Sequence, residues 1–95
     1  MGKPATCRIL IDGIVQGVGF RPFIYNLALR LELNGWVRNT SGGVEIEVSG
    51  TSSKLKQFIQ LIREEAPPLS RIDSLNSEEI NKKEFQGFEI QKSQI

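Results

Sequence analysis

Two amphipathic helical segments, separated by a strand–turn–strand unit, constrain the fold of this 95-residue chain more than any other feature. The first helix is predicted to begin near the Arg-Pro pair at 21–22, because proline suits a first helical turn, and to stop at the Asn-Gly pair at 34–35. The second is predicted to follow capping residues at 50–53 and to end at the Pro-Pro pair at 67–68. Their apolar side chains recur at helical spacing: Phe23, Leu27, Ala28 and Leu31, then Leu55, Phe58, Ile59 and Ile62.

The rest of the chain is predicted to form five short strands. They are predicted over residues 7–12, 36–39, 44–49, 71–77 and 85–91, with a polar stretch over 78–84. In the third strand Val44, Ile46 and Val48 are expected to face the core, while Glu45 and Glu47 face outward. The glycine turn between the second and third strands is typical of a hairpin.

The order of these elements predicts a single α+β domain over residues 1–95. A ferredoxin-like (split βαβ) sandwich fits it, with an antiparallel sheet of four to five strands and two helices on one face. In that topology the first two strands are parallel, lie roughly 10 Å apart with the third between them, and end at one edge. The segment 13–20, Arg21 and Asn39 are therefore expected to meet there.

Charge and hydropathy limit the classes of partner that this chain is expected to bind. The net charge is +1 and there is no basic run, which argues against a dedicated nucleic-acid binder. No apolar run approaches the roughly 18 residues that cross a bilayer. The N-terminus has no apolar signal region. We therefore expect a cytoplasmic protein without nucleic-acid or membrane partners.

The lack of histidine and the single cysteine limit the catalytic and metal-binding chemistry open to this chain. The chain has no His, and Cys7 is its one Cys. An internal disulfide and catalysis by Ser-His-Asp or Cys-His are excluded, and a metal site is not expected. No cofactor is expected either, so an enzyme here would work with Arg, Asn, carboxylates, backbone N–H groups and water. Cys7 itself is expected to be a core residue.

The glycine-rich segment 13–20 precedes the first predicted helix. Glycines let a backbone turn several N–H groups inward, a helix N-terminus adds partial positive charge, and Arg21 adds a planar cation. Together they predict an anion or phosphate cradle. The loop taken alone also fits a tight turn with a surface arginine.

Two motifs resemble the signatures of a known family. Residues 13–21 (GIVQGVGFR) resemble the first acylphosphatase signature, and residues 35–40 (GWVRNT) resemble the second. Residues 19–23 and 67–74, and the short turn at 42–44, are more similar to the N-terminal acylphosphatase-like domain of hydrogenase maturation carbamoyltransferases. The zinc-finger cysteines and nucleotide-handling regions of those enzymes are missing. The resemblance thus implies their first domain alone, either excised or naturally separate.

The resemblance implies an enzyme that hydrolyses acyl phosphates to carboxylate and phosphate, with carbamoyl phosphate as the substrate in hydrogenase maturation. By that likeness Arg21 anchors the phosphoryl group and Asn39 orients the attacking water. The phosphate-binding loop supplies backbone donors from Gln16, Gly17, Val18, Gly19 and Phe20. Other domains or proteins of hydrogenase maturation are the implied partners.

Two other functions remain open from the residues. A non-catalytic module that binds phosphate or another small anion would need the cradle but not Asn39. An RNA-binding domain of the same fold would need paired aromatics on its central strands, which residues 7–12 and 44–49 lack. Trp36 is read chiefly as a packing residue and Arg38 as a surface charge rather than a second phosphate ligand.

Overall fold

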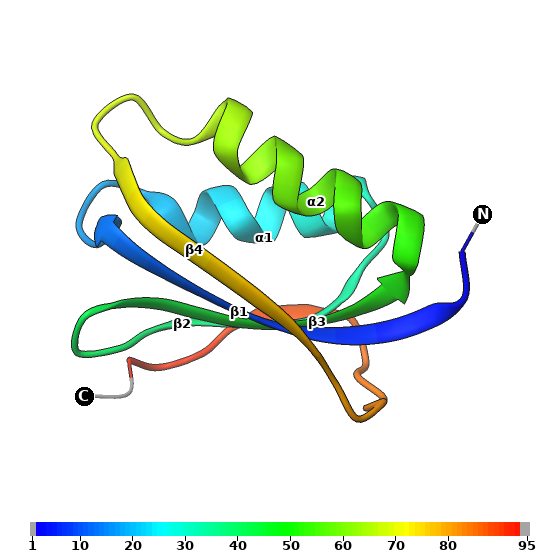
Figure 1. Ribbon diagram of the computed structural model, residues 1–95. Helices are drawn as coiled ribbons and strands as arrows, with labels where there is room; N and C mark the ends of the chain where they lie inside the picture. The colour runs from blue at the N-terminus through cyan, green and yellow to red at the C-terminus, as the bar shows by residue number, and fades with distance from the viewer. Residues whose placement is uncertain (1, 94–95) are drawn as a thin grey trace.

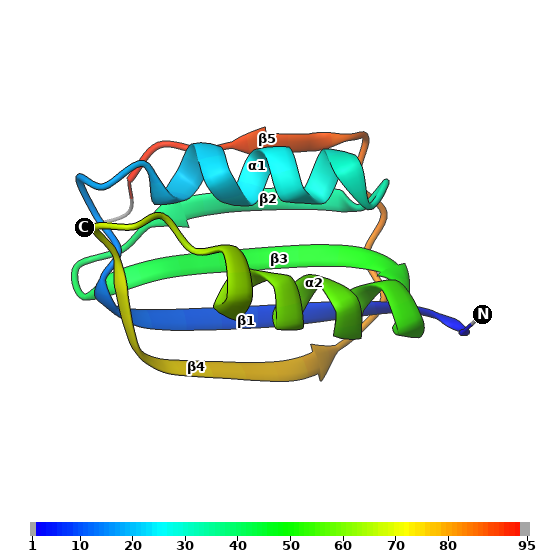
Figure 2. The ribbon, with the colours of Figure 1, turned by 90° about the horizontal axis from the view of Figure 1, so that it is seen from above.

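A five-stranded sheet carries two helices on one of its faces (Figure 1). The computed structural model describes residues 2–93. The elements are β1 (Pro4–Ile14), α1 (Phe20–Arg30), β2 (Asn34–Asn39), β3 (Gly43–Thr51), α2 (Ser52–Glu65), β4 (Arg71–Ile80) and β5 (Phe88–Ile90). The strand order is β4-β1-β3-β2-β5, so the predicted α+β class and the predicted place of the third strand are confirmed (Figure 2). No helix within residues 2–93 is long and apolar enough to cross a membrane.

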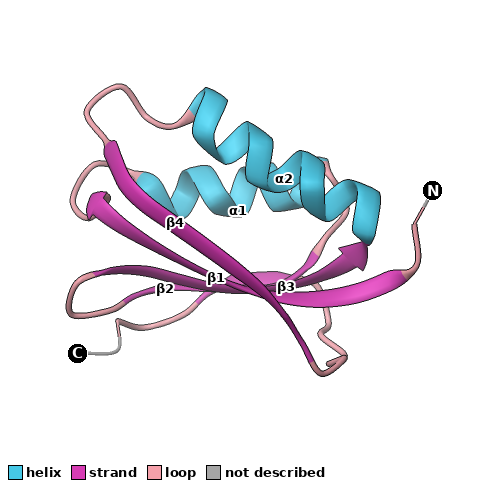
Figure 3. Cartoon of the chain, in the orientation of Figure 1, coloured by secondary structure: helices cyan, strands magenta, loops and turns pink. Residues whose placement is uncertain are grey.

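The sheet is mixed, which corrects the prediction of an antiparallel one. β1 pairs antiparallel with β3 and β4, and β2 with β3, but β2 and β5 are parallel. The reason is a crossing segment, residues 81–87, that reverses the chain after β4 and carries it to the opposite edge of the sheet (Figure 2). After β4 the chain runs as a loop (Figure 3). Lys83 holds this segment: its N–H donates to Oγ1 of Thr6 (3.1 Å), and its carbonyl accepts from the Ser49 hydroxyl (3.1 Å).

Several predicted element boundaries shift. α1 ends at Arg30 rather than at 34–35, because Glu32 takes a left-handed conformation (φ 59°) and turns the chain. The Asn-Gly pair instead opens β2, where the N–H of Gly35 donates to the carbonyl of Gly87 (2.9 Å). β4 continues three residues beyond its predicted end because residues 78–80 pair with β1, and β5 is correspondingly short.

The core lies between the sheet and the helices. Ile9 and Ile11 of β1, Ile46 of β3, Ile24 of α1 and Phe58 of α2 are at most 1% exposed. Truncating a buried aromatic side chain such as that of Phe58 to alanine typically destabilises a protein by about 3–5 kcal/mol. Both predicted helical stripes face this core, although Phe23 and Ile59 are only partly buried. The packing fixes the helices against the sheet and with them the N-terminus of α1.

One side chain that was expected to face outward does so but is nevertheless buried. Glu47 does lie on the sheet face away from the helices, but it is only 3% exposed. Lys83 of the crossing segment covers it with an ion pair of 2.8 Å, and Arg8 of β1 approaches to 3.2 Å. Burial would raise the pKa of this carboxyl, but the hydrogen bonds and charges of Lys83 and Arg8 outweigh burial and lower the pKa.

Candidate active site

The end of β1, the start of α1 and the end of β2 lie at the same end of the sheet (Figure 2). The strand pairing places Ile11, Val44 and Asn39 in one row across β1, β3 and β2. In such a row the first and third strands, here β1 and β2, lie roughly 10 Å apart. β1 then leads through a glycine loop, residues 15–19, into α1. The register therefore places the start of this loop and Asn39 at the same end of the sheet, and the start of α1, which carries Arg21, lies at that end as well.

The backbone N–H groups of the glycine loop and of the first two residues of α1 find no acceptor within the described part of the chain, whereas the N–H of Phe23 donates to the carbonyl of Gly19 (3.2 Å). Among residues 2–93, none of the N–H groups of residues 16–21 donates to a protein oxygen. Gly17 (φ 74°) and Gly19 (φ 79°) take the left-handed conformation that turns the loop, which glycine adopts at little steric cost. Unpaired donors at a helix start, reinforced by the helix dipole, favour an anion. This set includes the five groups that the sequence predicted as phosphate-binding donors, the N–H groups of Gln16, Gly17, Val18, Gly19 and Phe20.

Arg21 is the second residue of α1 and is half-buried. Four other arginines pair with carboxylates: Arg8, Arg30, Arg38 and Arg71. Within residues 2–93 neither Arg21 nor the exposed Arg63 has an ion-pair partner. A half-buried guanidinium with no carboxylate, beside unpaired N–H groups, is suited to two oxygens of a phosphate.

Asn39 is the last residue of β2. Strand alternation puts its side chain on the same face as Val37, which is fully buried beneath the helices. Its Oδ1 is buried and finds no hydrogen-bond donor among residues 2–93. Because an unsatisfied buried acceptor is costly, it is a favourable place for a donor from outside the chain, such as a water molecule.

Gln16 has a side-chain role that the sequence did not reveal. Its Nε2 donates to the carbonyl oxygens of Thr40 (2.6 Å) and Gly43 (2.8 Å), on the two sides of the β2–β3 turn. The glycine loop is thus tied directly to the residue after Asn39. No spacing rule in the sequence links a loop glutamine with carbonyls 24 and 27 residues away.

Other residues considered from the sequence lie elsewhere. Arg38 and Trp36 lie on the opposite sheet face from Asn39, where the Arg38 guanidinium lies 4.6 Å from the centre of the Trp36 ring and pairs with Glu45 (2.8 Å). This geometry agrees with packing and surface roles. Cys7 packs against the core and is half-buried, and burial, followed by the charge of Glu79, raises the pKa of its thiol.

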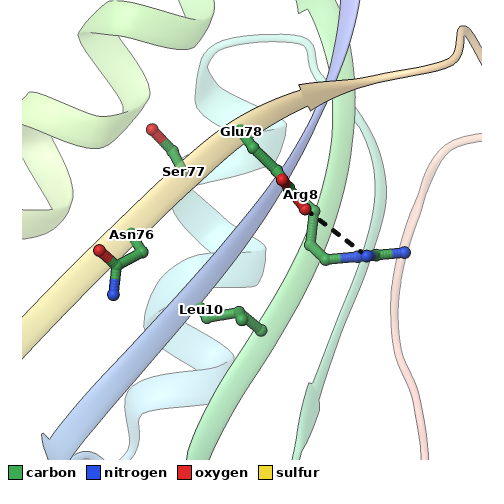
Figure 4. Close-up of a pocket in the computed structure, with 5 residues that line it drawn as sticks. All are labelled: Arg8, Leu10, Asn76, Ser77 and Glu78. Atoms are coloured by element: carbon green, nitrogen blue, oxygen red, sulfur yellow. Dashed lines mark ion pairs between the residues drawn. The ribbon is translucent and has the colours of Figure 1, made fainter.

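A pocket between β1 and β4 is separate from this edge (Figure 4). It is lined by Arg8, Leu10, Asn76, Ser77 and Glu78, and by neither Arg21 nor Asn39. Its one cation, Arg8, already lies 3.2 Å from Glu47 and 3.7 Å from Glu78. Because these carboxylates neutralise the charge of Arg8, the pocket lacks the free cation that an anion-binding site needs.

Comparisons with known proteins identify the family of this chain. The acylphosphatase family model matches residues 7–90. Carbamoyltransferase HypF2 of Cupriavidus necator is 47% identical over 76 residues, which are 80% of this chain and 9% of that protein. The acylphosphatase of Bacillus licheniformis is 45% identical over 83 residues, covering 86% of this chain and 89% of that protein.

Solved structures give the same assignment. Full-length HypF, in a phosphate- and nucleotide-bound form, superposes with a TM-score of 0.93 and 41% identity, over 99% of this chain and 13% of that one. The chain thus spans about a tenth of the carbamoyltransferases it matches. It also covers most of the length of separate acylphosphatases, whose structures confirm the ferredoxin-like fold. This chain belongs to the acylphosphatase family.

Proposed function

We propose that this chain hydrolyses acyl phosphates, with Arg21 and the N–H groups of residues 16–20 holding the phosphoryl group and Asn39 orienting the attacking water. The single observation that carries the proposal is the buried Oδ1 of Asn39, which has no donor among residues 2–93. An anion-binding site needs donors, whereas this group is an acceptor. A water that donates to it would be held at the same edge as the cradle.

The chemistry suits these residue types. An acyl phosphate is a mixed anhydride with a carboxylate leaving group, so cleavage needs little help from a general acid. Phosphoryl transfer depends chiefly on positioning and on neutralising the charge of the equatorial oxygens. Arg21 and the backbone N–H groups supply that neutralisation. An amide such as Asn39 aligns water without taking its proton, which passes to the phosphate.

The proposed physiological substrate is carbamoyl phosphate. Support comes from the relatives whose names describe carbamoyltransferases, of which this chain matches about a tenth. We propose that residues 1–95 act as one acylphosphatase-like domain in the cytoplasm and work with the other domains or proteins of hydrogenase maturation. The similarity to separate acylphosphatases supports activity of the domain by itself.

Release of inorganic phosphate tests the proposal. The wild-type chain is given benzoyl phosphate and, separately, carbamoyl phosphate, and Arg21→Ala is measured beside it. We expect turnover of both substrates and its loss in the variant. Turnover of benzoyl phosphate alone would remove carbamoyl phosphate as the substrate. Competitive binding of inorganic phosphate without any turnover would instead favour a non-catalytic anion-binding module.

A further inference from the structure

We infer that the side chain of Gln16 is a positioning residue, which sets Asn39 relative to the backbone donors of the glycine loop. This inference rests on the proposed function and adds to it. The residue already contributes a backbone N–H to the unpaired set. Its side chain reaches away from that set, toward the turn that follows β2.

The hydrogen bonds fit an amide group in one orientation. Nε2 lies 2.6 Å from the carbonyl oxygen of Thr40 and 2.8 Å from that of Gly43. An amide nitrogen carries two hydrogens, so one –NH₂ group can satisfy both oxygens. The amide oxygen could satisfy neither, because a carbonyl only accepts. The contacts therefore need a donor with two hydrogens at this place.

The two carbonyls lie on either side of the turn that carries Asn39. Thr40 directly follows Asn39, and Gly43 is the first residue of β3. The turn is closed by the N–H of Thr40, which donates to the carbonyl of Gly43 (2.9 Å). Gln16 thus holds both strands of the turn at once. Without it, the glycine loop and Asn39 are connected through the sheet, by way of β1, β3 and β2.

This arrangement separates binding of the anion from alignment of the water. Removing the Gln16 side chain leaves the loop N–H groups and Arg21 in place, so inorganic phosphate should still bind. It releases the turn next to Asn39, and a displacement of about 1 Å at a reacting group can lower a rate by about 100-fold. We therefore expect kcat to fall by about 10- to 100-fold, with the inhibition constant of inorganic phosphate changed by less than about 2-fold.

The test uses two variants and a matched control. Gln16→Met keeps the length of the side chain and removes both donors, and Gln16→Ala removes the chain altogether. Gln16 is solvent-exposed, so both are expected to fold, and thermal unfolding checks this. Gln60→Met is the control, because Gln60 also donates through Nε2, but to Glu64 on α2, and it should leave kcat unchanged.

A double-mutant cycle with Asn39→Ala distinguishes positioning from a general effect on the loop. Residues that act as a unit are not additive, so adding Gln16→Met to Asn39→Ala should lower kcat no further. A full additional loss in that background, or a parallel loss of phosphate binding, would overturn the inference. So would an unchanged kcat in both single variants. If the wild-type chain hydrolyses no acyl phosphate, the proposed function fails and the inference fails with it.

Discussion

Nη2 of Arg30 lies 3.0 Å from Oε1 of Glu65 and 3.1 Å from its Oε2, which ties the end of α1 to the end of α2. Arg21 lies on the same helix, and no carboxylate among residues 2–93 is within ion-pair distance of it. The two arginines can therefore be compared on one helix: Arg30 forms an ion pair within the fold, whereas Arg21 is available to a ligand.

Arg21→Ala is expected to lower turnover of benzoyl phosphate by about 1,000-fold or more, since loss of an arginine that stabilises a phosphoryl transition state has effects of this size. Arg30→Ala should keep turnover near the wild-type level, because the exposed pair that it removes contributes at most about 1 kcal/mol to stability. Steady-state phosphate release measures both. A folded Arg21→Ala protein with nearly full activity would show that the guanidinium is not part of the site.

Asn39→Ala is expected to impair chemistry more than binding. The variant loses the acceptor for the water but keeps Arg21 and the backbone donors, so kcat should fall by about 100-fold while inhibition by inorganic phosphate is largely retained. Asn34→Ala, at the exposed start of the same strand, is the control and should change neither quantity. Equal losses of kcat and phosphate affinity in Asn39→Ala would assign Asn39 to the cradle instead.

Alanine substitutions at the adjacent residues Gly42 and Gly43 should change the stability of the fold by different amounts. A Cβ on Gly43 would collide with the backbone oxygen of Ile11 across the strands, whereas a Cβ on Gly42 meets only Oδ1 of Asp12, at 3.8 Å. Gly43→Ala should therefore destabilise the fold by about 1–3 kcal/mol and lower turnover, because the turn beside Asn39 must shift. Gly42→Ala should change stability by less than about 0.5 kcal/mol. Urea unfolding compares the two, and equal stabilities would refute the steric argument.

Glu47 should make stability depend on acid pH. Its pKa in the folded chain is below its ordinary value of 4.5, so its stabilising contribution is present above that value and is lost as the pH falls through the folded pKa. Glu47→Gln should cost about 1–3 kcal/mol at neutral pH, and the difference from wild type should shrink below pH 4.5. Glu84→Gln, at an exposed position, is the control in urea unfolding at several pH values. A difference that is constant with pH would contradict the lowered pKa.

Local patterns predicted most of the fold. Alternation in residues 44–49 and helical spacing in residues 55–62 place in the core the side chains that the structure buries, except that Ile59 is only partly buried. Glu47 departs from this pattern because Lys83, on a crossing segment with no regular structure, covers it. The parallel pairing of β5 has the same origin. Nothing in residues 81–87 specifies locally that the chain turns back and runs to the far edge.

The site was predicted through topology and motifs rather than through side-chain contacts. Register explains why Asn39 and the glycine loop share an edge, since both follow from the place of β3 between β1 and β2. Among residues 2–93 Arg21 has no ion-pair partner and the buried Oδ1 of Asn39 has no donor. Both facts depend on which other groups pack nearby, and sequence spacing carries no such information. The bonds from Gln16 to the β2–β3 turn are of the same kind.

Hydrolysis of benzoyl phosphate in water enriched in ¹⁸O tests the central claim most directly. If Asn39 orients water toward a phosphoryl group held by Arg21 and the loop, the new bond forms at phosphorus. Mass spectrometry should then find the label in the inorganic phosphate and none in the benzoate. Label in the benzoate would mean attack at the acyl carbon and would contradict the account, as would enzyme-catalysed release that continues at the wild-type rate in Arg21→Ala.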